Sequence, residues 1–128
     1  MQPEFLEIED VLQIHADQIE RYGGLQGLRD LGLLTSAVAM PKAMYAGIFL
    51  HEDIYAMAAA YLFHITRNHP FLDGNKRAGA ASALVFLDIH GIEVSAPEDD
   101  LYNLVIGVAT GSVDKPTIAA FFREHSER

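Results

Sequence analysis

A histidine, an aspartate and two adjacent cations lie within residues 69–77, in the middle of the chain: His69, Asp73, Lys76 and Arg77. An imidazole has an ordinary pKa of about 6.5, which suits a general base. A carboxylate is a hard oxygen ligand of the kind Mg²⁺ takes together with substrate phosphates. Lysine and arginine bind phosphate oxygens, arginine through a bidentate fork. These residue types together favour a phosphate site, with Mg²⁺ at Asp73 and His69 as the base.

The residues between these groups suit the same chemistry. Gly74 and Asn75 precede a predicted helix, so free main-chain N–H groups and the positive end of the helix dipole would face the loop and bind an anion. Phe71 is expected to anchor the loop in the core. Asp-Gly-Asn is also an ordinary turn and N-cap sequence. The residues alone therefore leave two readings open, a nucleotide or phosphate site and a structural turn.

The residues that several other kinds of catalytic or metal site require are absent from the sequence. The chain has no cysteine, which excludes disulfide scaffolds, cysteine zinc sites and thiol catalysis. It contains no G-x-x-x-x-G-K-[ST], no G-x-G-x-x-G and no G-x-S-x-G. No two histidines have the i, i+4 spacing of a helical zinc pair, and none is followed by aspartate. His64 falls inside an apolar helical pattern, where a packed histidine is expected rather than a ligand.

Apolar periodicity and breaker residues predict six helices and almost no strand. The predicted helices are residues 7–22, 30–40, 52–68 and 75–90, one that follows a capping-box pattern at Ser95 and ends near Thr110, and one from Asp114 to about Ser126. Residues 41–50 read as a loop with a little extended structure, and residues 92–94 as a short extended piece. Gly23 is expected to end the first helix in the left-handed αL conformation. Asp30 is expected to cap the second helix, and Pro41 to stop it.

The helices at 52–68 and 75–90 carry little polar surface, so both are expected at the centre of the fold. The loop with His69 and Asp73 would then connect two buried helices. We therefore expect an all-α fold with one domain over residues 1–128.

Composition limits the class of protein. The chain has 128 residues, with nine Lys+Arg against eighteen Asp+Glu and a formal net charge of −9. This charge argues against a direct nucleic-acid binder. No apolar run approaches the roughly 18 residues of a membrane span, and the N-terminus lacks the pattern of a signal peptide. A soluble, cytoplasmic protein without a membrane partner is expected.

The segment H-P-F-L-D-G-N-K-R at residues 69–77 resembles the signature of the Fic/Doc family, H-x-F-x-[DE]-G-N-[GK]-R. Residues 21–24, 27–30, 32–34 and 109–111 are similar to the death-on-curing (Doc) branch of that family. The resemblance implies a Fic fold, ATP and Mg²⁺ as cofactors, and a role for each motif residue. His69 would take the proton of the target hydroxyl, Asp73 would hold Mg²⁺, Gly74 and Asn75 would form the anion hole, Lys76 and Arg77 would bind the ATP phosphates, and Phe71 would anchor the loop.

Two departures from the wider family favour the Doc branch. AMP-transferring Fic enzymes usually have glycine where this chain has Lys76, and a second arginine where it has Ala80. Doc-branch members resemble kinases that pass on the γ-phosphate of ATP, and they phosphorylate elongation factor Tu and stop translation. The resemblance thus implies a toxin kinase. AMP transfer to a protein hydroxyl and, less favoured, a non-catalytic helical module that binds an antitoxin are the alternatives.

Many Fic proteins carry an inhibitory [ST]-x-x-x-E-[GN] motif, which this chain lacks. The nearest approach, Ser95 with Asp99 and Asp100, has the wrong residues. Inhibition is therefore expected from a separate antitoxin protein. Counted with glycine, the apolar share lies a little above the about 45–50% of typical domains. This excess has two readings: some helices are buried all round, or an apolar surface is reserved for a partner. With the inhibitory motif missing, we expect an apolar groove beside residues 69–77 that accepts an amphipathic antitoxin helix.

Overall fold

The computed structural model describes residues 2–127. Within them, the only strands are four two-residue segments that form two antiparallel pairs, β1–β2 and β3–β4, which confirms the all-α prediction. The elements in chain order are α1 (Ile8–Tyr22), α2 (Leu31–Ala39), the 3₁₀ turn η1 (Met40–Lys42), β1 (Met44–Tyr45), β2 (Ile48–Phe49), α3 (Ile54–Asn68), α4 (Asn75–Ile89), β3 (Glu93–Val94), α5 (Glu98–Thr110), α6 (Lys115–Glu124) and β4 (Ser126–Glu127). No helix in this part of the chain is long and apolar enough to cross a membrane.

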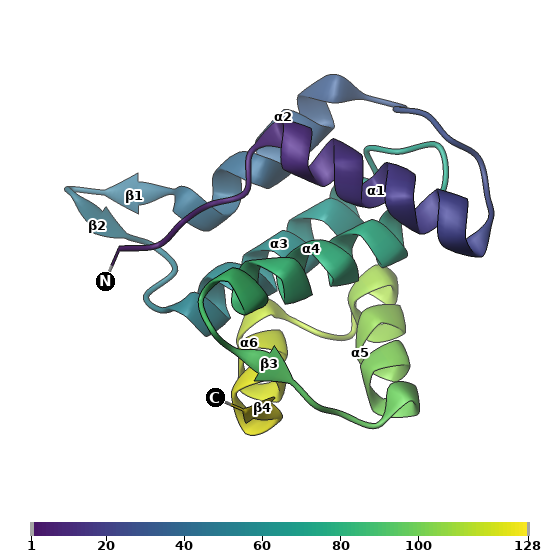
Figure 1. Ribbon diagram of the computed structural model, residues 1–128. Helices are drawn as coiled ribbons and strands as arrows, with labels where there is room; N and C mark the ends of the chain where they lie inside the picture. The colour runs from purple at the N-terminus through teal and green to yellow at the C-terminus, as the bar shows by residue number, and fades with distance from the viewer. Residues whose placement is uncertain (1, 128) are drawn as a thin grey trace.

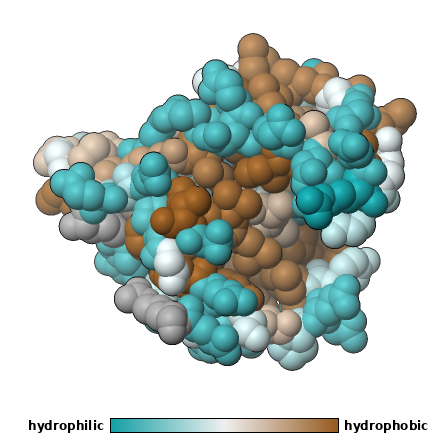
Figure 2. All heavy atoms as spheres, viewed as in Figure 1, coloured by the Kyte–Doolittle hydropathy of each residue, from teal (hydrophilic) through white to brown (hydrophobic). Residues whose placement is uncertain are grey.

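Helices α3 and α4 lie side by side at the centre, with α1 and α2 on one side and α5 and α6 on the other (Figure 1). Both helices carry buried small side chains, among them Ala58 and Ala83, and a Cβ at Gly79 of α4 would lie 3.1 Å from the main-chain oxygen of Leu62 in α3. Small side chains let the two helices approach closely, and the apolar area removed from water stabilises the pair. The central position predicted for these two helices is confirmed. On the face shown in Figure 2, hydrophilic residues gather over α1.

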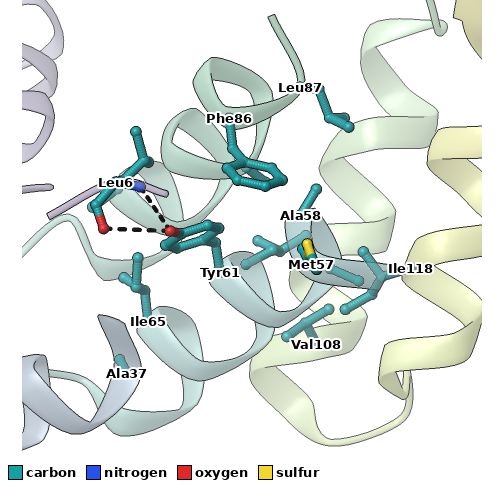
Figure 3. Packing of buried hydrophobic residues seen from close by; sticks show 14 of the residues in the cluster. Leu6, Ala37, Met57, Ala58, Tyr61, Ile65, Phe86, Leu87, Val108 and Ile118 are labelled. Carbon is teal, nitrogen blue, oxygen red and sulfur yellow. Dashed lines mark hydrogen bonds between the residues drawn. The ribbon is translucent and has the colours of Figure 1, made fainter. Parts of the chain in front are cut away.

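The N-terminal segment is joined to this core through Tyr61 of α3 (Figure 3). The Tyr61 side chain is fully buried, and its hydroxyl lies 2.9 Å from the main-chain nitrogen of Leu6 and 3.4 Å from its oxygen. The Phe86 ring of α4 packs against Tyr61 with ring centroids 5.2 Å apart. A buried hydroxyl needs such partners, because an unpaired one would cost about 1–3 kcal/mol. Burial raises the pKa of Tyr61.

Aspartate side chains cap the starts of α2, α3 and α6. Asp30, Asp53 and Asp114 each accept a hydrogen bond from a main-chain N–H in the first turn of α2, α3 and α6, at 2.8–3.0 Å. Each satisfies one of the free N–H groups at a helix start. The caps predicted at Asp30 and Asp114 are confirmed, and Asp53 moves the start of the third helix from residue 52 to Ile54.

The prediction of a capping box at Ser95 is wrong. Helix α5 begins at Glu98 after Pro97, which makes no side-chain cap, and the main-chain N–H of Ser95 donates to the His125 oxygen at 2.8 Å. The last helix is also shorter than predicted, because Ser126 pairs with Val94 in the β3–β4 ladder. Gly23 ends α1 with the expected positive φ of 86°, but its ψ of 168° lies outside the αL region.

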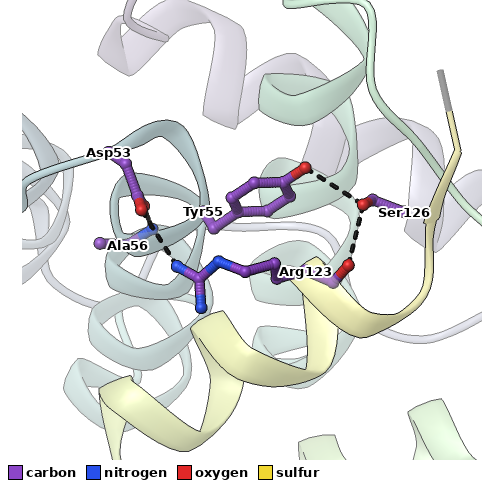
Figure 4. A network of polar contacts seen from close by, with 5 residues as sticks. All are labelled: Asp53, Tyr55, Ala56, Arg123 and Ser126. Atoms are coloured by element: carbon purple, nitrogen blue, oxygen red, sulfur yellow. Dashed lines mark hydrogen bonds and ion pairs between the residues drawn. The ribbon is translucent and has the colours of Figure 1, made fainter.

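A polar network at the far end of α3 joins this helix to α6 (Figure 4). Arg123 pairs with Asp53 at 3.0 Å and lies over the Tyr55 ring. The Tyr55 hydroxyl donates to Ser126 at 3.1 Å. The loop between α3 and α4 lies at the opposite end of α3, next to α1 and the α1–α2 connection (Figure 1).

Candidate active site

His69 ends α3 in a conformation that few residues other than glycine adopt. Its backbone has φ 54° and ψ 51°, and its N–H donates to the Ile65 oxygen at 3.3 Å. Such left-handed backbone is uncommon for non-glycine residues and often marks functional sites. The His69 side chain is exposed and lines a cleft beside the loop.

This cleft, of about 620 Å³, brings most of the predicted site together. Its walls come from the end of α3, the connecting loop, the start of α4 and the end of α5. The lining residues are Thr66, Arg67, His69, Leu72, Asp73, Gly74, Asn75, Lys76, Arg77 and Ala109. Every residue proposed for catalysis, metal or nucleotide binding is therefore in one cleft, and Phe71, proposed as an anchor, lies beneath it at 1% exposure.

The start of α4 supplies an anion site through its main chain. Gly74 is the N-cap, with φ 76° and ψ 22° and no side-chain cap. Across residues 2–127, no hydrogen-bond acceptor meets the main-chain N–H groups of residues 75–77. Those groups and the helix dipole attract anions. The positive φ favours glycine here, and a Cβ at Gly74 would lie 2.8 Å from Cδ1 of Ile19, which would have to shift.

Two of the predicted anion-hole groups have other partners. The Gly74 N–H donates to Oδ1 of Asp73 at 2.8 Å. The Asn75 side chain is 4% exposed and binds the main chain of Phe71 twice, accepting from its N–H at 2.9 Å and donating to its oxygen at 3.1 Å. The Asn75 amide therefore holds the loop in shape, and anion binding at this helix start is left to the main chain.

The carboxylate of Asp73 is oriented by main-chain donors. Its Oδ2 accepts from the Leu25 N–H at 3.0 Å and its Oδ1 from Gly74. These two hydrogen bonds, with the charges of Arg77 and His15, lower the pKa of Asp73. The group is therefore ionised at neutral pH, and within residues 2–127 each oxygen accepts one hydrogen bond.

An ionised carboxylate with free lone pairs fits Mg²⁺. Across the described part of the chain, no group of three or more His, Asp or Glu side chains could hold a metal ion by itself. Mg²⁺ does not need such a cage, because it usually keeps several waters and binds one or two carboxylates plus substrate phosphates. Asp73 at the cleft wall has the chemistry for such a site.

Lys76 and Arg77 differ in their freedom to bind a ligand. Arg77 donates through Nη1 to the main-chain oxygens of Gly23 at 2.8 Å and Gln18 at 3.4 Å, at the end of α1. Lys76 is exposed, and none of the described groups forms a hydrogen bond or ion pair with its ammonium. Lys76 is thus the freer of the two predicted phosphate ligands.

The α1–α2 connection lies along the loop and supports it. The main-chain N–H groups of Arg29 and Asp30 both donate to the main-chain oxygen of Pro70, at 2.7 and 3.0 Å. The Arg29 side chain donates to the main-chain oxygens of His69 at 2.7 Å and Asn68 at 3.2 Å. These carbonyls end α3, where a cation is favoured by the helix dipole. Arg29 therefore fixes the backbone that carries the proposed base.

A second support comes from α1. His15 is 3% exposed, its ring stacks on Phe71, and its Nε2 donates to the main-chain oxygen of Asp73 at 2.7 Å. No role for His15 or Arg29 is predicted from the sequence. For Arg29 the similarity over residues 27–30 was the available signal. His15 had none, because its hydrogen-bond partner Asp73 is 58 residues away in the chain.

An apolar groove of about 390 Å³ adjoins the cleft, and Lys76 and Arg77 line both. Its walls come from α4 and α5, and Figure 2 shows brown residues in the hollow between these helices. The remaining lining residues are Ala80, Glu98, Leu101, Tyr102, Val105 and Ile106. Tyr102 is 64% exposed, which is high for an aromatic side chain. The groove lies beside residues 69–77, and the antitoxin helix expected there stays a prediction.

Comparison with known proteins agrees with the motif. The model of the Fic/DOC family matches residues 5–87. The chain is 41% identical over 119 residues to the toxin Doc of Mycolicibacterium smegmatis (strain ATCC 700084 / mc(2)155), covering 91% of this chain and 89% of that protein. It is 35% identical over 116 residues to the protein kinase doc of Escherichia phage P1, covering 90% of each.

Proposed function

Because the chain belongs to the Fic/DOC family, we propose that it is a Doc-type toxin that transfers the γ-phosphate of ATP to a hydroxyl group of a protein. The names of the two relatives, a toxin and a protein kinase, support this choice. Lys76 and Ala80 support it as well, because both depart from the pattern of AMP-transferring members. We further propose elongation factor Tu as the target, which would stop protein synthesis.

The observation that carries the proposal is the convergence of three kinds of group in one cleft. His69 contributes an exposed imidazole, Asp73 an ionised carboxylate, and the start of α4 free main-chain N–H groups beside the Lys76 ammonium. Phosphoryl transfer consists mainly of positioning and of stabilising negative charge, so these groups meet its needs.

In the proposed reaction the oxygen of the target hydroxyl attacks the γ-phosphorus of ATP. The bond from this phosphorus to the β–γ bridging oxygen breaks, ADP leaves, and the hydroxyl proton passes to the imidazole of His69. Lys76 and the N–H groups of residues 75–77 hold phosphate oxygens. Mg²⁺, when bound at Asp73, supplies charge neutralisation at the phosphates.

We also propose that a separate antitoxin restrains the enzyme. The relative named toxin Doc supports this, since a toxin must be restrained in its own cell. The groove between α4 and α5 would take an amphipathic helix of the antitoxin. Because Lys76 and Arg77 line both the groove and the cleft, a helix bound there would lie against the phosphate site.

Two samples of ATP, labelled at the α or the γ phosphate, test the reaction. Incubation with purified elongation factor Tu and Mg²⁺ should label the target from γ-labelled ATP only, and a His69→Ala protein should transfer no label. Labelling from α-labelled ATP would instead identify AMP transfer. No label from either sample, with toxicity undiminished by His69→Ala, would favour the non-catalytic alternative.

A further inference from the structure

Arg67 is a third cation of the cleft, and it lies outside the nine-residue motif. It belongs to the last turn of α3, two residues before His69, and it lines the cleft together with Lys76 and Arg77. Arg77 donates to the end of α1, so part of its guanidinium has a protein partner. Among the described residues Arg77 uses only Nη1, so its Nε and Nη2 remain for a ligand, and Arg67 adds a further guanidinium to the same cleft.

Among the described residues, one nitrogen of the Arg67 guanidinium has protein partners. Nη1 donates to the main-chain oxygens of Ala109 at 3.1 Å and Val108 at 3.4 Å, at the end of α5. Across residues 2–127, Nε and Nη2 make no hydrogen bond and no carboxylate pairs with this side chain. The contact with α5 thus orients the planar group and leaves donors free for a ligand.

The end of α5 is shaped around this guanidinium. Gly111 follows the helix, and a Cβ at that position would lie 3.3 Å from Nη1 and 3.8 Å from Cζ of Arg67. The carbonyls at the end of α5 favour a cation through the helix dipole. They cannot replace an anionic partner, so the positive charge of Arg67 stays available to the cleft.

The second arginine of AMP-transferring members has no counterpart in this cleft. Its position is Ala80, which lines the apolar groove on the other side of Lys76 and Arg77 and is absent from the cleft lining. Arg67 brings an arginine to the cleft from α3 instead of α4. In the proposed reaction His69 lies next to the phosphate that is transferred, and Arg67 lines the same cleft.

We propose that Arg67 binds the terminal phosphate of ATP and so makes the cleft selective for the triphosphate over the diphosphate. This assignment rests on the proposed function, because it assumes that ATP is the substrate. A bidentate contact from a fixed guanidinium suits a terminal phosphate, which carries the most charge and the most free oxygens of the chain.

Calorimetric titration with ATP and with ADP, both with Mg²⁺, tests the assignment in a His69→Ala background, in which transfer is expected to be at least about 10²-fold slower. Arg67→Met keeps the length of the side chain and removes its charge, and Arg67→Lys keeps the charge without the fork. Arg123→Met is the matched control, because it removes the same charge at the other end of α3. Thermal unfolding of each variant measures the structural effect of the lost contact with α5.

The Arg67→Met protein should bind ATP at least about tenfold more weakly, as expected for the loss of charge-assisted hydrogen bonds. Its affinity for ADP should change by less than about threefold, Arg67→Lys should be intermediate for ATP, and Arg123→Met should bind both as the background does. An equal loss for ATP and ADP, or a lower melting temperature with unchanged affinities, overturns the assignment. If the background protein binds neither nucleotide, the proposed function fails as well.

Discussion

The imidazole of His15 lies flat on the ring of Phe71, with ring centroids 3.7 Å apart and planes 3° apart. The same imidazole donates to the main-chain oxygen of Asp73 at 2.7 Å. The buried side chain of His15 thus contacts the ring face of Phe71, the loop anchor, and the main chain of Asp73, the proposed metal ligand. The geometry of the cleft depends on how α1 packs as well as on the motif itself.

Replacing His15 by leucine should lower the free energy of unfolding by about 1–3 kcal/mol, through loss of the buried hydrogen bond and the stacking. It should also reduce phosphate transfer, because the loop loses its support. His90→Leu is the control, since His90 also bonds a main-chain oxygen at 2.7 Å and packs on a phenylalanine, at the far end of α4. Urea unfolding and a transfer assay separate the effects. Equal activity of the two variants would contradict a role for His15 in the site.

Replacing His69 by asparagine should reduce transfer by about 10²–10⁴-fold, the usual contribution of a general base, while the fold stays intact. Asparagine suits this test because it tolerates the left-handed backbone of His69 better than alanine does. Thermal unfolding of the purified variant should match that of the parent. A folded His69→Asn protein that retains full transfer would rule out His69 as the base.

Replacing Asp73 by asparagine should slow transfer and raise the Mg²⁺ concentration needed for half-maximal rate, because the metal loses its charged protein ligand. Asp114→Asn is the control, because hydrogen bonds from Thr117 also lower the pKa of Asp114, but this carboxylate lies outside the cleft. Transfer rates of both variants, measured across a Mg²⁺ titration, test this expectation. Full activity of the parent protein in excess EDTA would refute the metal site.

Stability should fall as the pH drops below about 6.5, because two histidines are held neutral in the fold. Burial, then the charge of Lys115 and the nearby His51, lower the pKa of His64 to about 4. Burial and Lys115 also lower the pKa of His51, and the Lys115 ammonium lies 3.1 and 3.2 Å from the two Nε2 atoms. Between pH 6.5 and 4 the unfolded chain binds protons that the folded chain refuses, so unfolding is favoured.

Urea unfolding at several pH values between 7.5 and 4.5 measures the slope of the free energy of unfolding against pH. A protein with both His51→Gln and His64→Gln should show a flatter slope. Lys115→Met should flatten it in part, because burial remains as the larger cause. A double variant with the slope of the parent would place the titrating groups elsewhere.

Replacing Tyr102 by aspartate should weaken antitoxin binding at least about tenfold, since a charge would enter the apolar groove. The side chain is 64% exposed, so the fold should tolerate the change. Tyr45→Asp is the control, as Tyr45 is 78% exposed on β1, at a distance from the groove. Binding is measured by titrating the purified antitoxin into each variant. Equal affinity of the two would place the antitoxin elsewhere on the surface.

The sequence by itself determined the class of fold and predicted which segment forms the candidate site. Apolar periodicity and aspartate caps such as Asp30 act over a few residues, so the pattern of a segment is enough to predict its helix. Ser95 shows where such local rules stop. Its capping pattern is present, but its N–H bonds the oxygen of His125, 30 residues further along the chain, and α5 begins later.

The kinds of side chain at the candidate site could also be predicted from the sequence, because His69, Asp73 and Lys76 lie close together in the chain. The tertiary structure alone decided which donors remain free for a ligand. Packing of α1 brings main-chain oxygens to Arg77, and packing of α5 orients Arg67 into the same cleft. The freedom of a guanidinium depends on which carbonyls other helices bring to it, and residue order within one segment does not contain that information.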